Sequence, residues 1–319
     1  MVKKEWYDHF LDVLAEKYPK KAELAHALMD LLNIEREAAY RRLRKDVIFP
    51  MHEIVQIATA WHISLDEIIG VKSQKVLFQM QPLNYLCPSK ADMNFVRKKV
   101  QTLEQIQDSS DSEYILACNN LSRTISFGFR NLYKFLIFKW AYEYHNDYND
   151  TFASINIPEA LSREVDRFYK IMKYVKNTSF ILDNMIFENV IREIQFFHSI
   201  FLITDEEKAL VKKDLQALSD YLYEVASTGC FPETKNKVQI YVSTLNINTN
   251  YSYFCSNDIE ICRVHAFNIY DLITYNPELI KKFKVWMQKK KRTAIQISEV
   301  DEKTRIEYFT KLRQLVDSL

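Results

Sequence analysis

The stretch KAELAHALMDLLNIEREAAYRRLRKD, residues 21–46, decides how the N-terminal part of the chain folds. From Leu24 onward, leucine recurs at i, i+4, i+7 and i+8, the spacing of one helix face. Asn33 can end that helix in the left-handed conformation. A short helix then begins at Ile34, with Ala39 and Leu43 facing inward. The stretch therefore predicts two helices joined by a tight junction.

Helical patterns also lie on both sides of this stretch. Residues 4–18 carry apolar side chains at helical spacing, and Pro50 suits the first turn of a helix that runs to Trp61. The segment SLDE, residues 64–67, has the pattern of a capping box and predicts the start of a further short helix, which Gly70 ends. The first seventy residues thus predict five short helices.

This order of helices resembles the DNA-binding domain of the XRE-type, phage-repressor-like helix-turn-helix transcriptional regulators. The segments that carry the resemblance are KAELAHALMDLLNI, EREAAYRRLRKD, EIVQIATAWHI and HISLDEIIG. The resemblance covers the N-terminal domain only. It implies a bacterial regulator whose third helix enters the major groove of double-stranded DNA.

The resemblance also singles out residues for DNA contact. On the third helix, arginine can read guanine through two hydrogen bonds, and the residues beyond it can reach backbone phosphates. The positive end of the second helix dipole can meet another phosphate. The implied readers of bases or sugar-phosphate are Arg36, Glu37, Tyr40 and Arg41, and the implied phosphate contacts are Arg44, Lys45, Lys20 and Lys21.

A different interpretation of the same segment stays open. A run of basic residues is often a solvated helix face, and residues 1–72 contain eleven Lys/Arg and twelve Asp/Glu, a net charge of −1. DNA affinity depends on neutralising phosphates. The alternative is a helix-turn-helix-like domain that binds a protein partner instead of DNA.

Composition excludes several classes of function. The 319 residues include only 3 Gly, so glycine-rich phosphate loops are excluded. The formal net charge of +1 gives no overall electrostatic attraction for nucleic acid, a membrane or an acidic substrate. The five cysteines form no C-x-x-C pair, which indicates reduced thiols. The N-terminus lacks the apolar core of a signal peptide, and the longest apolar cluster, 132–142, is too short to span a bilayer. We therefore expect a cytoplasmic protein that does not enter the membrane.

The rest of the chain predicts a larger, mainly helical domain. We expect a DNA-binding domain at 1–72, a connector and linker helix at 73–112, and a C-terminal domain at 113–319. Residues 113–227 show mostly helical patterns, with one central helix at 180–203. Residues 238–243, 251–256 and 259–267 show strand patterns, which predict a small antiparallel sheet near the C-terminus.

Three segments of this larger part allow two interpretations each. Met93, Val96, Val100 and Leu103 form a heptad seam for a dimer, or pack onto their own domain. The aromatic segment 127–142 is core or the wall of a ligand pocket. The basic run 281–292 contacts DNA or an anionic effector, or is a solvated helix end.

No catalytic or metal-binding motif is present in the sequence. None of the seven histidines has metal-ligand spacing, and no nucleophile elbow is found. We therefore expect no enzyme, no cofactor and no metal. The sequence favours a sequence-specific transcriptional regulator that acts as a homodimer, whose C-terminal domain dimerises or senses an unidentified small-molecule effector. A C-terminal domain with unrecognised chemistry is the weaker third hypothesis.

Overall fold

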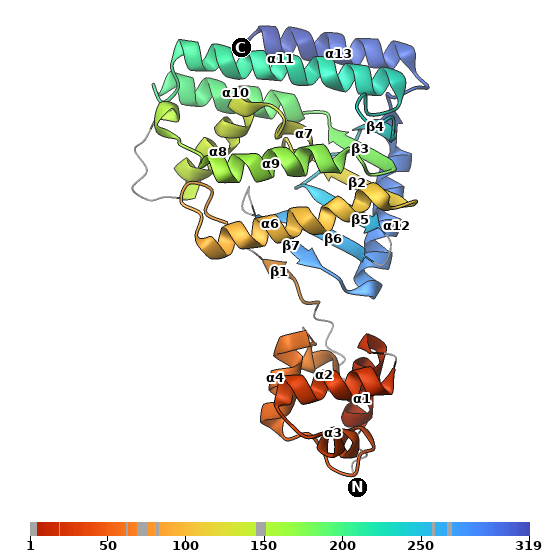
Figure 1. Cartoon of the computed structure of the whole chain (residues 1–319). Coiled ribbons are helices and arrows are strands. Elements are labelled where there is room, and N and C mark those ends of the chain that lie inside the picture. The colour runs from red at the N-terminus through yellow and green to blue at the C-terminus, as the bar shows by residue number, and fades with distance from the viewer. Residues whose placement is uncertain are drawn as a thin grey trace. The chain divides into compact units, whose positions relative to one another are not determined.

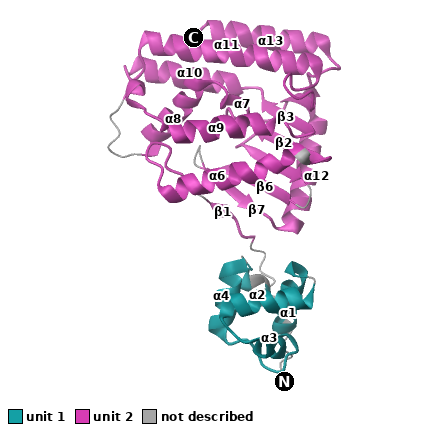
Figure 2. Ribbon diagram, in the orientation of Figure 1, with its two compact units in different colours: residues 1–75 teal, residues 76–319 magenta. Residues whose placement is uncertain are grey.

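The computed structural model divides the chain into two compact units, residues 1–75 and residues 76–319 (Figure 2). The structure describes residues 5–18, 20–61, 63–68, 76–80, 83–144, 151–256, 259–266 and 270–319. We refer to the two parts as unit 1 and unit 2. Within the described residues, no helix is both long and apolar enough to cross a membrane.

Unit 1 is helical, with a helix in each of the five predicted ranges. These are α1 (Glu5–Lys17), α2 (Lys21–Leu32), α3 (Arg36–Leu43), α4 (Met51–Trp61) and α5 (Leu65–Ile68). Its core is built on fully buried side chains such as Phe10, Leu14 and Leu28. Asn33 has a φ of 51°, which confirms the predicted left-handed end of α2. The capping box predicted at residues 64–67 lies partly outside the described residues, since the Asp66 and Glu67 side chains are not described, and neither is Gly70.

An ion pair fixes α3 to α4 inside unit 1. The guanidinium group of Arg42 donates from Nε to one carboxylate oxygen of Glu53 and from Nη2 to the other, both at 2.7 Å. Both side chains are largely buried, and the two parallel bonds restrain their relative orientation. One arginine of the basic stretch is therefore a structural residue that holds α3 in place.

Unit 2 contains a central mixed sheet, so the prediction of a mainly helical fold with a small antiparallel sheet near the C-terminus was wrong. The described residues form one eight-stranded sheet in the order β1-β7-β6-β5-β2-β3-β4-β8. Its middle strands β2, β3 and β4 are parallel, and the other neighbours pair antiparallel. The strands are β1 (Gln79–Met80), β2 (Ser112–Cys118), β3 (Asn177–Asp183), β4 (Lys237–Ser243), β5 (Tyr251–Ser256), β6 (Ile259–Ala266), β7 (Tyr270–Thr274) and β8 (Ala294–Gln296).

Two central strands were missed because both of their faces are buried. On β2, Leu116 packs into the large core on one side of the sheet, whereas Ile115 and Ala117 pack into the smaller core on the other side. Such strands are continuous apolar runs without alternation, and short apolar runs resemble buried helix. For the same reason the expected single helix at 180–203 is instead the end of β3 followed by α10 (Ile186–Ser199).

Helices cover both faces of this sheet (Figure 1). The basic run 281–292 belongs to α12 (Pro277–Thr293), whose buried Ile280 and Met287 pack against one face. Most other helices lie over the opposite face, in the large core. They are α6 (Lys90–Glu104), α7 (Arg123–Ser126), α8 (Arg130–Tyr144), α9 (Glu159–Met172), α10, α11 (Asp205–Thr228) and α13 (Glu302–Asp317), with short 3₁₀ turns at Gln105–Asp108 and Phe152–Ser154.

The predicted heptad seam lies inside unit 2. Val100 and Leu103 of α6 are buried, Leu103 in the large core, and Met93 and Val96 pack against that core. These side chains therefore pack within their own unit, which agrees with the second interpretation of this helix, packing onto its own domain. A capping box between Thr204 and Glu207 begins α11.

Candidate functional site

One face of α3 carries the exposed Arg36, Glu37 and Arg41 and the half-buried Tyr40, which packs against the core of unit 1. Arg36 and Tyr40 lie one turn apart, with the Arg36 guanidinium 5.6 Å from the Tyr40 ring centroid. Glu37 and Arg41 form the neighbouring i, i+4 pair and are exposed. No described residue forms an ion pair or hydrogen bond with the Arg41 side chain. We call Arg36, Glu37, Tyr40 and Arg41 the α3 surface.

The other basic residues predicted to contact DNA have different surroundings. Arg44 donates to Glu37 at 2.8 Å and to Asp46 at 3.0 Å, and these hydrogen bonds raise the pKa of Arg44. Lys45 lies 2.5 Å from a carboxylate oxygen of Asp8. Intramolecular acids thus neutralise much of the charge at the end of α3.

The two lysines of α2 lie away from the α3 junction. Lys20 and Lys21 are at the start of α2, which joins α3 at its other end, and a 12-residue helix is about 18 Å long. Lys20 forms an exposed ion pair with Glu23 at 2.9 Å, while Lys21 is exposed. The structure therefore brings the α3 surface together as a group, and places these two lysines at a separate point of unit 1.

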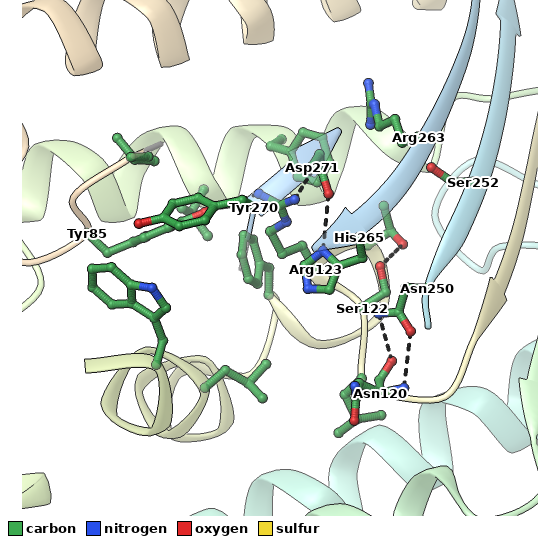
Figure 3. A pocket seen from close by; sticks show the side chains of 18 of the residues that line it. Tyr85, Asn120, Ser122, Arg123, Asn250, Ser252, Arg263, His265, Tyr270 and Asp271 are labelled. Atoms are coloured by element: carbon green, nitrogen blue, oxygen red, sulfur yellow. Dashed lines mark hydrogen bonds and ion pairs between the residues drawn. The ribbon is translucent and has the colours of Figure 1, made fainter. Parts of the chain in front are cut away.

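Unit 2 contains a cavity of about 170 Å³ between its sheet and the helices of the large core (Figure 3). The cavity borders residues 120–124, which follow the carboxyl end of β2. At this strand the sheet changes from parallel pairing with β3 to antiparallel pairing with β5. Open α/β sheets bind ligands beyond the carboxyl ends of strands, where the direction of the connections changes.

Asn250 holds the loop at the carboxyl end of β2 through hydrogen bonds. Its Oδ1 accepts hydrogen bonds from the backbone N–H groups of Asn119 and Asn120 at 3.0 and 3.1 Å, and its Nδ2 donates to the Asn120 carbonyl at 3.2 Å (Figure 3). The backbone N–H of His265 donates to the Asn250 carbonyl at 2.8 Å. These bonds link the loop to β6 and fix the floor of the cavity.

A charged network spans the cavity from α7 to β7. Arg123 donates to a carboxylate oxygen of Asp271, and at 3.1 Å to the hydroxyl of Tyr85. His265 Nδ1 lies 3.2 Å from the other oxygen of Asp271. Burial acts to raise the pKa of Asp271, but Arg123 and His265 outweigh it and hold that pKa well below its usual range. Asp271 is therefore ionised and neutralises Arg123.

Two further cations of the cavity, Lys99 and Arg263, form no ion pair among the described residues, although the charge of Asp271 acts on both from beyond contact distance. Burial, followed by the nearby Arg263 guanidinium, lowers the pKa of Lys99 to about 7. Among the described residues, the Lys99 ammonium group has no ion-pair or hydrogen-bond partner, and the buried Nε of Arg263 has no hydrogen-bond acceptor. Arg263 lies on β6 opposite Ser252 of β5, and its charge helps to lower the pKa of Asp271 on the neighbouring strand β7 (Figure 3).

Much of the remaining wall of the cavity is apolar. Trp140 and Leu136 of α8, Phe168 of α9 and Val190 of α10 line it together with Tyr270 of β7, beside the ion-paired Lys139, Glu164 and Glu193. An apolar wall with a few converging polar groups is the usual composition of a small-molecule site. Most of the aromatic segment 127–142 is buried in the large core, and part of it also lines the cavity, so both interpretations of this segment apply.

The described residues show no cluster of three or more His, Cys, Asp or Glu side chains that could hold a metal ion. Cys262 and His265 lie near one another in sequence, but Cys262 is buried in the smaller core whereas His265 lines the cavity. Cys262 and His265 are therefore not brought together in the folded chain.

Sequence analysis missed Lys99 and Arg263, although each carries a periodic signal. Lys99 lies three residues after Val96 and four before Leu103, on the buried side of α6. Arg263 is two residues from both Ile261 and His265, so the three side chains share one face of β6. A charged side chain on an otherwise apolar face is a signal of a functional site, because lysine and arginine are seldom buried without a partner.

Comparison of the chain with protein-family models, curated proteins and solved structures gave no match. A function for this chain must therefore be argued from its own residues.

Proposed function

We propose that the chain is a sequence-specific DNA-binding transcriptional regulator. Unit 1 binds double-stranded DNA by placing α3 in the major groove, and unit 2 provides ligand sensing or dimerisation. Two copies of the chain would present their α3 helices about 34 Å apart, which suits a pseudo-palindromic site.

The observation that supports this proposal is the α3 surface. It carries two exposed arginines on an exposed helix face, and the neighbouring Arg42 fixes α3 to α4 through Glu53. A recognition helix needs both properties, because a side chain reads a base edge only when its helix is held in a fixed orientation. Arg41 has no protein partner among the described residues, so its donors are available to DNA.

A protein-interaction module remains the alternative function. It is favoured by the ion pairs Arg44–Glu37, Arg44–Asp46 and Lys45–Asp8, which leave little free positive charge near the end of α3. A surface with balanced charge suits a protein partner better than a phosphate backbone.

Selection of bound duplexes from a random pool, with the full chain, tests the proposal. We expect a conserved sequence to emerge, and Arg41→Ala to weaken binding to it by about tenfold or more, since one arginine contact to guanine contributes about 1–3 kcal/mol. Lys290→Ala is the matched control, because Lys290 lies on α12 of unit 2, over the ring of Trp286. We expect that variant to bind within about twofold of the original chain.

Three outcomes would contradict the proposal. The selection recovers no preferred sequence, the two variants lose affinity equally, or no duplex binds at low salt. The last outcome favours the protein-interaction module, because any DNA-binding domain gains phosphate affinity as salt is removed.

A further inference from the structure

The cavity of unit 2 contains more positive than negative charge once its ion pairs are counted. Each carboxylate that lines it already has a cation beside it. These pairs are Asp271 with Arg123, Glu193 with Lys139 at 2.5 Å, and Glu164 with Arg167 at 2.7 Å and Arg97 at 3.6 Å. Lys99 and Arg263 form no ion pair among the described residues, and the one carboxylate whose charge reaches both, Asp271, is already paired with Arg123.

We propose that this cavity binds a small organic anion, whose charged group lies between Lys99 and Arg263 and whose apolar body lies against Trp140 and Phe168. The charged group is a carboxylate or a phosphate, since both match the donors of arginine and lysine.

The position of the two cations supports an anionic ligand. A buried charge is costly unless it is paired, and arginine cannot release its proton to avoid that cost. Arg263 on β6 thus keeps its charge beside Lys99, although its guanidinium disfavours the charged form of Lys99. An incoming anion would interact with both cations at once and would supply an acceptor for the buried Nε of Arg263.

The apolar part of the wall supports an apolar body for the ligand. Trp140, Phe168 and Val190 of α8, α9 and α10 line the cavity, beside the ion-paired Lys139, Glu193 and Glu164 of the same helices. An inorganic anion has no apolar surface to place against the apolar side chains. The volume of about 170 Å³ is close to that of an engineered cavity of about 150 Å³ that binds benzene, so one ring or a short branched chain fits.

Binding of the anion involves unit 2 alone, whereas a regulatory effect on DNA rests on the function proposed above. An experiment can therefore contradict anion binding without contradicting DNA binding, and the reverse. A chain that binds the anion but no duplex keeps this inference and loses the proposed function. A chain that binds a selected duplex but no organic anion keeps the proposed function and loses this inference.

Calorimetric titration of the full chain tests the inference directly. The probes are benzoate, cyclohexanecarboxylate, phenyl phosphate, inorganic phosphate and the neutral benzyl alcohol. We expect at least one of the three organic anions to bind at least about tenfold more tightly than benzyl alcohol and than inorganic phosphate. The ratio of benzoate to phenyl phosphate affinity distinguishes a carboxylate site from a phosphate site.

Variants then test the two cations. Lys99→Met and Arg263→Met are each expected to weaken binding of the best anion by about tenfold or more, and to leave benzyl alcohol unchanged. Lys98→Met is the matched control, because Lys98 is the exposed neighbour of Lys99 on α6, and it should bind as the original chain does. Circular dichroism of each variant shows whether a lost affinity is due to unfolding.

The inference is overturned if no organic anion binds at about 10 mM, a concentration that detects even affinities near −3 kcal/mol. It is also overturned if the neutral alcohol binds as tightly as the anions, or if folded Lys99→Met and Arg263→Met variants both bind as Lys98→Met does.

Discussion

Basic side chains have opposite surroundings in the two units. At the end of α3, Arg42, Arg44 and Lys45 follow one another closely in sequence, and each has a carboxylate beside it. In unit 2, Lys99 and Arg263 lie far apart in sequence, both line the cavity, and neither forms an ion pair among the described residues. The cluster that is conspicuous in the sequence is largely neutralised, whereas the inconspicuous pair is not.

The difference shows that the pairing of basic side chains, more than their density in the sequence, decides whether they can attract a charged partner. An exposed ion pair contributes little, since water and salt screen it, and it also reduces the attraction for a charged partner. An unpaired and largely buried cation is unfavourable for folding, so its presence indicates a requirement outside folding. The following changes test both halves of this comparison.

Arg42→Ala should have the largest effect on unit 1. It leaves the buried carboxylate of Glu53 without its partner, and breaking a buried ion pair in this way costs about 3 kcal/mol. Hydrogen exchange resolved by peptide, on the full chain, should show faster exchange in α3 and α4. Arg41→Ala is the control, because its side chain is exposed, and it should exchange like the original chain. Equal effects of the two changes would show that Arg42 is not a structural residue.

Lys99→Met should have a smaller effect, and one of opposite sign. We expect it to increase the free energy of unfolding at pH 6 by about 1 kcal/mol, a common gain when a residue kept for function is replaced. The reason is that the folded chain holds the charged Lys99 in a site that disfavours it, as its pKa of about 7 indicates.

The gain should shrink as the pH rises. Above pH 7 the folded chain releases the Lys99 proton, whereas the unfolded chain holds it up to about pH 10.4. In that interval the unfolded state binds more protons, so the stability of the original chain increases with pH and approaches that of the variant. Urea unfolding at pH 6 and pH 9 measures this trend, with Lys98→Met as the control. A stability loss in Lys99→Met at both pH values would mean that Lys99 serves the fold.

Arg44→Ala should have the smallest effect of the three. Its pairs with Glu37 and Asp46 are exposed, so we expect the urea midpoint of the full chain to stay unchanged within measurement error. A clear loss of stability would show that exposed pairs in unit 1 matter for its fold, and would weaken the contrast with Arg42.

The helices of unit 1 were predictable because each exposes one face and buries the other. The leucine repeat of α2 and the left-handed Asn33 are local signals that need no knowledge of the rest of the chain. The parallel strands of unit 2 lack such a signal, since Ile115 and Leu116 are adjacent in sequence and yet are buried in two different cores. Their identity depends on what covers each face, which only the folded chain decides.

The candidate sites divide in the same way. The α3 surface is one continuous segment, so helical spacing alone groups Arg36 with Tyr40. The cavity instead takes Lys99 from α6, Arg123 from α7 and Arg263 from β6. Periodicity could have marked Lys99 and Arg263 as inward-facing charges, but it could not have shown that they face each other, because that depends on the order of strands in the sheet.

The shortness of β1 has a mechanical consequence. Its two residues, Gln79 and Met80, pair with Leu272 and Ile273 of β7, the strand that also brings Tyr270 and Asp271 into the wall of the cavity. β1 lies at the edge of the sheet, so β7 is its one strand neighbour among the described residues. A molecule that displaces β7 on entering the cavity would therefore also break the pairing of β1. By the reciprocity of linked equilibria, a change that holds β1 more firmly against β7 would in turn change how tightly the molecule is bound.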